Sequence, residues 1–340
     1  MNDREREEII DLCNACFGES PDFTRFYFNA KYRPGRALVV RRDGRPAAAL
    51  LLVPYAFSRA GRLLDMAYIS WACTRADCRG EGLMTRLLAD AFRHARSRGF
   101  ALAALIPGDP SLFDYYRRFG FSPVFERVAI EERGEGPVDA PRQVTEIAPD
   151  DARAFLAARV WRADNRVQHD REDFTVISAS IADSGGALLA ARAPGGAIEG
   201  VAVVAPDPGK IIVEEWASDA PAARHSLVRA IADRWLGRVQ EWRGPTGSVA
   251  SRHHHGMARL LNVSAFLSDH AARHPGETLA IEVLDEIIPE NRGLFILRDG
   301  ACHRAHSTAA PVVVMNIDQL TSFLLQDDPS LPPYMSLMLD

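Results

Sequence analysis

One basic, glycine-containing segment of the sequence has residue types and a spacing suited to holding a phosphate group. It consists of Arg79, Gly80, Glu81, Gly82, Leu83, Met84 and Thr85. The segment follows the apolar stretch 63–74, which predicts a strand, and precedes apolar residues at helical spacing that end at Gly99. Glycine lets the backbone approach a ligand closely, and the unpartnered N–H groups at a helix start favour negative charge. The segment therefore predicts a pyrophosphate site, with an ordinary strand-to-helix turn as the alternative.

The charge around this segment is strongly positive. Between Lys31 and Arg98 the sequence has fourteen Lys and Arg residues against five Asp and Glu residues, an excess of nine positive charges. The chain as a whole carries a net charge of −5, so it lacks the basic character of a protein that coats nucleic acid. The local excess is either a solvated arginine-rich face or the surroundings of an anionic small molecule.

A tyrosine near the end of a short helix is the second candidate for chemistry. The helix is expected over residues 110–119, and Gly120 caps it before a strand that begins at Ser122. Tyr116 in this helix has two interpretations. It is either a buried core aromatic, which is the commoner role of a single tyrosine, or a second part of the site formed by the glycine segment.

A mixed α/β unit over residues 1–132 must position both motifs. Its expected elements are helices over 3–17 and 22–31, antiparallel strands over 37–42, 46–57 and 63–74, a helix up to residue 99, a strand over 100–106, the helix 110–119 and a strand over 122–131. The segment 133–141 is rich in Gly, Pro and acidic residues and is the expected linker.

Two further units are expected after the linker. Residues 143–250 repeat the element order of the first unit in degraded form, with helices over 149–161 and 220–236 and strands over 187–192, 198–204 and 210–217. This second unit has no glycine segment, so we expect it to be structural. Residues 256–340 form a third unit with helices over 263–273 and 318–325, strands over 278–285, 293–298 and 312–316, and an extended proline-rich tail. The three histidines 253–255 are expected in a loop before it.

The two motifs resemble those of a known enzyme family. Arg79-x-x-Gly82-x-Met84 resembles the R-x-x-G-x-G/A acetyl-CoA loop of the GNAT N-acetyltransferases, and Tyr116 to Phe121 resembles their Tyr-x-x-x-Gly-Phe motif. Two GNAT-like units, a sterol-carrier-protein-like domain and a tail are similar in layout to the Eis-like (enhanced intracellular survival) branch. Met84 stands where GNAT enzymes usually have Gly or Ala, and we interpret it as a mark of that branch.

The resemblance implies a role for each motif. The pantetheine arm of acetyl-CoA would bond the strand end, and its pyrophosphate would lie on the glycine loop. Tyr116 would return a proton to the departing thiolate, and the terminal carboxylate, which reaches the first unit in Eis-like proteins, makes Asp340 the candidate base. A frayed tail is the equal alternative for that residue. The predicted cofactor-binding residues are Ala72, Cys73, Thr74, Arg79, Gly80, Glu81, Gly82, Leu83, Met84, Thr85, Ser111 and Leu112.

Composition limits the class of protein further. At 340 residues, 47% hydrophobic and 25% charged, the chain has the make-up of a globular protein of several domains. No apolar stretch is long enough to cross a bilayer and the charged N-terminus lacks a signal core, so we expect a cytoplasmic protein without a membrane partner. Five cysteines form no evident disulfide framework, and Cys13-x-x-Cys16 lacks the second pair of a zinc site, so we expect no metal.

We therefore expect an acetyl-CoA-dependent N-acetyltransferase that acts on the primary amine of a small molecule or peptide by direct transfer. Its amine pocket is expected near Phe26, Tyr27, Trp71 and Tyr116, with the tail closing it. The Eis-like resemblance implies a homo-oligomer, specifically a hexamer. The main alternative is a non-catalytic acyl-CoA-binding or regulatory protein. A lipid carrier led by the third unit is a further alternative.

Overall fold

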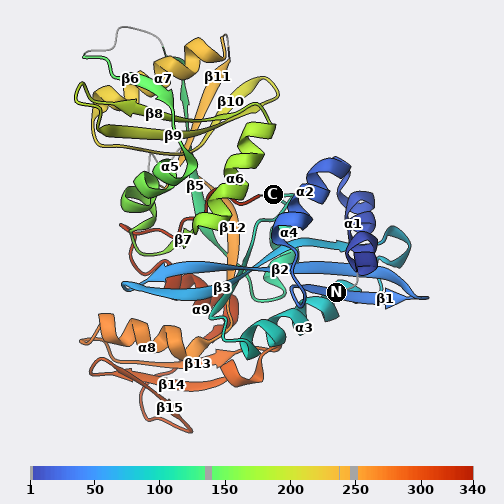
Figure 1. The fold of residues 1–340 in the computed structure, drawn as a ribbon. Helices are drawn as coiled ribbons and strands as arrows, with labels where there is room; N and C mark the ends of the chain where they lie inside the picture. The colour runs from blue at the N-terminus through green and yellow to red at the C-terminus, as the bar shows by residue number, and fades with distance from the viewer. Residues whose placement is uncertain (1–2, 135–139, 237, 246–251, 340) are drawn as a thin grey trace.

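Two sheets and the helices around them build the molecule in the computed structural model, which describes residues 3–134, 140–236, 238–245 and 252–339. Within these residues the larger sheet has twelve strands in the order β1-β2-β3-β4-β12-β5-β11-β10-β9-β8-β6, with β7 paired to β2. The smaller sheet has four strands in the order β15-β14-β13-β16. The larger sheet runs through the first and second units, and the smaller one belongs to the third (Figure 1).

The first unit contains every element that the sequence predicts, with bounds that agree within two residues. Its elements are α1 (Asp3–Phe17), α2 (Pro21–Lys31), β1 (Ala37–Arg42), β2 (Arg45–Arg59), β3 (Arg62–Thr74), η1 (Ala76–Cys78), α3 (Leu83–Ser97), β4 (Leu102–Leu105), α4 (Leu112–Arg117) and β5 (Ser122–Glu132). The apolar face of α3, with Leu88, Ala91 and Phe92 fully buried, packs on the sheet and fixes the helix start beside the end of β3.

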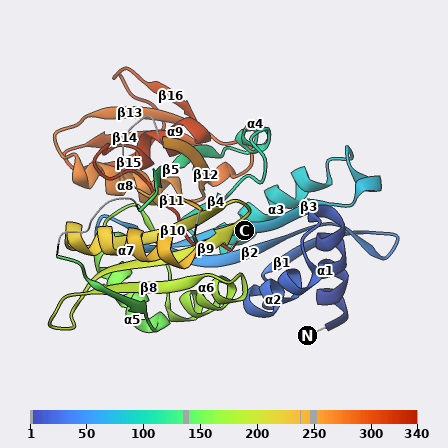
Figure 2. The same ribbon diagram turned by 90° about the horizontal axis from the view of Figure 1, so that it is seen from above.

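The second unit repeats the core of this arrangement and adds elements that the sequence did not reveal. Its elements are β6 (Gln143–Glu146), α5 (Pro149–Leu156), η2 (Ala157–Trp161), β7 (Arg166–Gln168), α6 (Arg171–Asp183), β8 (Ala187–Arg192), β9 (Ile198–Asp207), β10 (Lys210–Ser218), α7 (Pro221–Arg234) and β11 (Val239–Gly244). Helix α6 lies beside α2 of the first unit (Figure 2), where Lys31 donates to Asp173 and Arg33 to Glu172.

One strand between the second and third units corrects a sequence expectation. Residues 253–255 do not form a loop: they lie on β12 (Arg252–Leu260), which pairs with β4 on one side and β5 on the other. Residues 256–260, which the sequence assigned to the third unit, therefore complete the sheet of the first unit. Buried Met257, Ala258 and Leu260 supply the apolar side chains that an interior strand requires.

The third unit packs α8 and α9 on the small sheet and continues into the tail. Its elements are α8 (Val263–Arg273), β13 (Leu279–Leu284), η4 (Pro289–Asn291), β14 (Gly293–Arg298), β15 (Ala301–Ala305), β16 (Val313–Asn316) and α9 (Ile317–Leu325). It meets the first unit at a fully buried ion pair, in which Arg259 donates to both oxygens of Asp285 and to the carbonyl of Phe119. Gly120 lies at this contact, because a Cβ there would lie 2.2 Å from Ile317.

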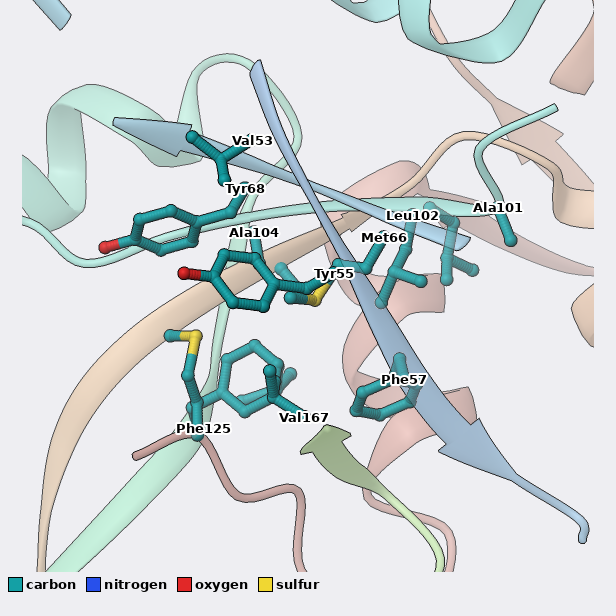
Figure 3. Packing of buried hydrophobic residues seen from close by; sticks show 14 of the residues in the cluster. Val53, Tyr55, Phe57, Met66, Tyr68, Ala101, Leu102, Ala104, Phe125 and Val167 are labelled. Atoms are coloured by element: carbon teal, nitrogen blue, oxygen red, sulfur yellow. The ribbon is translucent and has the colours of Figure 1, made fainter. Parts of the chain in front are cut away.

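The core joins the first two units into one body. Figure 3 shows Tyr55 and Phe57 of β2 packed with Phe125 of β5 and with Val167 of β7, which comes from the second unit. The tail after α9 is extended as expected, and its residues Tyr334, Met335 and Leu337 are buried between the units. No helix in the described ranges is long and apolar enough to span a membrane.

Candidate active site

A cavity of about 560 Å³ lies where β3 ends and α3 begins, and α4 forms its other side. Most of the residues that the sequence analysis proposed for the cofactor line this cavity. Its lining consists of Cys16, Phe17, Ala72, Cys73, Thr74, Cys78, Arg79, Gly80, Gly82, Leu83, Met84, Thr85, Leu112, Tyr115, Tyr116 and Arg118. Residues from five separate elements (α1, β3, η1, α3 and α4) therefore meet around one space.

The end of β3 borders the cavity because β3 and β4 separate there. The two strands pair in parallel only from Met66 to Tyr68, opposite Leu102 to Ala104. Beyond Tyr68, β3 keeps its antiparallel partner β2 but has no pairing with β4. The backbone groups of residues 72–73 on the β4 side are thus available to an extended ligand such as a pantetheine arm. The carbonyl of Thr74 already accepts hydrogen bonds from Cys16 at 3.5 Å and Arg79 at 3.3 Å.

The start of α3 forms a cradle for an anion. Gly80 (φ +80°) and Gly82 (φ +73°) both adopt the left-handed conformation, and a Cβ at either position would point into open space. Gly82 is the N-cap and offers no side chain, so the first N–H groups of α3 lack a side-chain partner. Open space at two glycines and free N–H groups at a helix start fit the pyrophosphate of a coenzyme A thioester.

Two of the predicted cofactor residues do not line the cavity. The Glu81 side chain forms an ion pair with Arg42 on β1, which holds the carboxylate away from the anion cradle. Ser111 precedes α4, and its N–H donates to the carboxylate of Asp109 over 2.8 Å. The lining instead includes Phe17, Tyr115 and Arg118, which the sequence analysis did not propose. The adjacency of Tyr115 and Arg118 to Tyr116 was the only sequence signal for them.

Tyr116 lies on α4 at the inner wall of the cavity. Its side chain is buried against Tyr115 and Phe121, with ring centroids 5.3 and 5.9 Å away. Burial, with a smaller contribution from Tyr115, raises the pKa of Tyr116 to about 12. The hydroxyl therefore keeps its proton at neutral pH and can donate it to a basic group in the cavity.

A second cavity of about 350 Å³ adjoins the first. The two share Phe17, Ala72, Leu112 and Tyr116, so the second space opens onto the end of the proposed thioester site. Its remaining lining residues are Glu19, Phe23, Tyr68, Ile69, Ser70, Trp71, Leu105, Ile106, Gly108 and Leu339.

The expected amine pocket matches this second cavity only in part. Trp71 and Tyr116 line it, but Phe23 takes the place expected for Phe26, because Phe23 is the α2 residue that faces the space. Tyr27 lies behind the lining, where its hydroxyl and that of Ser70 are 2.7 Å apart. Leu339 brings the tail to the cavity wall, whereas Asp340 lies outside the described residues.

One group of side chains in the described part of the chain has the composition of a metal site. His270, His274 and Asp327 present ligand atoms within 4.8 Å of one another. Arg59 and Arg273 already bond the Asp327 carboxylate. Burial acts to raise the pKa of Asp327, but its bonds to His270 and the two guanidinium groups outweigh burial and lower it. These ion pairs account for the cluster, and none of its residues lines either cavity.

Comparison with known families identifies two parts of the chain. Residues 1–124 match the acetyltransferase (GNAT) domain and residues 263–328 match the sterol carrier protein domain. The chain therefore contains a GNAT acetyltransferase domain followed, at its C-terminal end, by a sterol-carrier-protein-like domain, which confirms the resemblance inferred from the motifs. The first unit is by class an acyltransferase domain. No curated protein matches the sequence.

Solved structures extend the likeness to the fold of the whole chain. A probable N-acyltransferase from Enterococcus faecalis has a TM-score of 0.76 at 18% identity, with 94% of this chain and 87% of that chain covered. Eis1 from Mycobacterium abscessus has a TM-score of 0.73 at 17% identity, with coverages of 96% and 88%. A GCN5-related N-acetyltransferase from Anabaena variabilis has a TM-score of 0.76 at 15% identity, with coverages of 95% and 88%. At these identities the likeness establishes the fold.

Proposed function

We propose that the protein transfers an acetyl group from acetyl-CoA to a primary amine by direct attack. The observation that carries this proposal is the junction of the two cavities at Tyr116. One cavity has the anion cradle and the open edge of β3, and the other is a separate space for an acceptor. A binding protein for acyl-CoA has no need of the second space or of a protonated tyrosine between the two.

In this proposal, different groups of the chain bind the phosphates, orient the thioester and transfer protons. Acetyl-CoA supplies an activated acyl group. The N–H groups at the start of α3 hold the phosphates, and the β3 edge at residues 72–74 orients the thioester. The amine nitrogen then forms a bond to the acyl carbon as the carbon–sulfur bond breaks. Tyr116 donates its proton to the departing sulfur, and the proton of the amine passes to a base. Leu339 on the cavity wall supports Asp340, the next residue, as the proposed base.

Thiol release in the presence of acetyl-CoA and a panel of amines tests the proposal. Tyr116→Phe should lower kcat by about 10²–10⁴-fold, because the general acid is removed while the ring still packs. Tyr32→Phe, at a buried tyrosine that lines neither cavity, is the matched control and should keep the wild-type kcat. A chain ending at Ser336 tests the tail.

The outcomes separate the alternatives. A loss of turnover in both Tyr116→Phe and the shortened chain supports the acetyltransferase with a catalytic tail. A loss in Tyr116→Phe alone keeps the enzyme and removes Asp340 as the base. Binding of acetyl-CoA without thiol release from any amine contradicts the proposal and favours a regulatory acyl-CoA-binding protein.

A further inference from the structure

Trp71 has a backbone conformation that its residue type rarely adopts. Its φ is +54°, in the left-handed region, where a bulky side chain is strained. The cause is a β-bulge: β3 and β2 are in register at Ser70–Leu51 and again at Cys73–Ala49, so Trp71 and Ala72 face the single residue Leu50. The bulge turns the Trp71 ring into the second cavity, of about 350 Å³, which we call the acceptor cavity. Trp71 lies directly before the β3 edge at residues 72–74.

Aromatic rings surround Trp71 on this side of the sheet. Phe17 meets it edge to face with a centroid distance of 5.2 Å, and Phe23 lies 6.5 Å away. Tyr27 and Phe28 support it from behind at 5.5 and 5.8 Å. Phe17, Phe23 and Trp71 all line the acceptor cavity, so a ligand ring placed there meets aromatic faces and edges.

The described residues around the acceptor cavity offer few charged partners for a ligand with several positive charges. Among the described lining residues the cavity has one carboxylate, that of Glu19, which is exposed. A third cavity of about 360 Å³ shares Phe23, Ile106 and Leu339 with it and continues between the first two units. In the described walls of that cavity the one carboxylate, Glu214, already accepts hydrogen bonds from Arg243 at 2.8 Å. A polycation that extends beyond the acceptor cavity would find no unpaired carboxylate among those residues.

We propose that the acceptor is a primary monoamine on an aromatic or similarly sized apolar group, with that group held against Trp71 and Phe23. This inference rests on the proposed function and names its substrate class. The single amine reaches the thioester beside Tyr116 in its neutral form. The products are the N-acetylated amine and the free thiol of coenzyme A, and the proton leaves the nitrogen as in the proposed reaction.

Steady-state kinetics over matched amines tests the substrate class. Phenethylamine and tryptamine represent the proposed class, and spermidine and kanamycin represent the polycations. We expect kcat/KM for the aromatic monoamines to exceed that for the polycations by at least about ten-fold, because contacts with both Trp71 and Phe23 favour a ligand ring. Phe23→Ala should remove most of this preference through KM. Phe26→Ala, three residues further along α2 and outside the lining, is the matched control and should retain it.

Each outcome bears on one of the two proposals. A preference for aromatic monoamines that Phe23→Ala loses and Trp71→Phe retains supports the inference. Faster turnover of spermidine or kanamycin overturns it while the acetyltransferase function stands. An equal preference in Phe23→Ala and wild type also overturns it, because the ring contact would then not select the substrate. No turnover of any amine, with acetyl-CoA still bound, overturns the proposed function itself.

Discussion

The first and second units share a strand–turn–helix arrangement but use it differently. In both, a long central strand pairs in parallel with its later neighbour over a short stretch and then separates from it: β3 from β4 after Tyr68, and β10 from β11 after Val213. Both strands also carry a β-bulge near the point of separation, beside Trp71 in the first unit and at Glu214 in the second. The backbone features that border the candidate site of the first unit, two separating strands and a β-bulge, are thus also present in the second unit.

The turns after these two strands differ in their ability to bind an anion. The first turn has Gly80 and Gly82 in the left-handed conformation, and α3 starts with free N–H groups. The second turn has Ala220 as N-cap and Pro221 at the first helical position, where proline lacks an N–H group. Asp219 in this turn pairs with Arg159 and places a carboxylate where the first unit has its anion cradle.

The second unit instead holds the chain's own tail. Glu215, the residue after the bulge in β10, is fully buried and accepts hydrogen bonds from Ser336 at 2.5 Å and from Tyr334 at 3.3 Å. His169 bonds the carbonyl of Ser336. These contacts direct the tail toward Leu339 at the acceptor cavity. The second unit therefore supports a segment whose Leu339 lines the cavity of the first unit.

The largest expected effect is a change with pH in the free energy of unfolding, caused by the buried Glu215 of the second unit. Burial raises the pKa of Glu215 to about 7, although hydrogen bonds from Ser336 and other groups act in the opposite direction. Since the folded state raises this pKa from 4.5, the stability linked to Glu215 is fully present below about pH 4.5 and is lost as the pH rises to about 7. The loss is roughly 3 kcal/mol at about 1.4 kcal/mol for each pKa unit.

Urea unfolding at pH 5 and pH 8 measures this dependence. Wild type should lose more unfolding free energy between the two values than Glu215→Gln, whose amide cannot ionise. Glu172→Gln, at an exposed carboxylate of the same unit, is the control and should follow wild type. An equal loss in Glu215→Gln and wild type would mean that folding does not raise the pKa of Glu215 and that its ionisation does not affect stability.

The second prediction concerns the two left-handed glycines at the start of α3 and compares them with two left-handed glycines of the second unit. Gly80→Ala combined with Gly82→Ala should weaken acyl-CoA binding about 100-fold, because the relaxed alanine backbone must return to the left-handed conformation on binding at roughly 1–2 kcal/mol for each position. Gly185→Ala combined with Gly196→Ala is the matched control. Both of its glycines are in the second unit, left-handed (φ +77° and +86°), and have open space around the added Cβ.

Isothermal titration with coenzyme A gives the dissociation constants, and urea unfolding gives the stabilities. Both double variants should lose similar unfolding free energy, but only the first should lose affinity. A similar loss of affinity in both would show that general backbone strain, rather than the position of the cradle, governs binding.

Sequence patterns predicted the elements that define the site because each leaves a strong local signal. The helical spacing of Leu87, Leu88 and Phe92 placed α3, and the glycines placed its start. The missed elements have weak local signals. Strand β7 has three residues, and α6 (Arg171–Asp183) contains β-branched and serine residues that obscure a helical face. The position of β12 between β4 and β5 depends on contacts distant in sequence, which periodicity does not report.

In the candidate site, too, residues with a local sequence signal were predicted, and residues placed by contacts distant in sequence were missed. Residues 79–85 were predicted because they are contiguous and chemically distinctive, and residues 72–74 because the family resemblance implies a role for the strand end. Phe17 and Leu339 were not, because their places in the lining depend on how a helix end and the tail pack against β3. Trp71 was predicted for the amine pocket and lines it. The strained bulge that directs its ring there is a property of the β2–β3 register.

The smallest expected effect concerns the ion pair that replaces the cradle in the second unit. Arg159 and Asp219 are both about one-third or more exposed, and an exposed pair contributes about 0–1 kcal/mol. Asp219→Asn should therefore change the unfolding free energy by less than about 1 kcal/mol. It should also leave the stoichiometry of coenzyme A binding at one per chain, because Pro221 still lacks the N–H group that a phosphate requires. Titration of Asp219→Asn alone and with Pro221→Ala measures this. A second binding event in the single variant would show that charge, not backbone geometry, separates the two units.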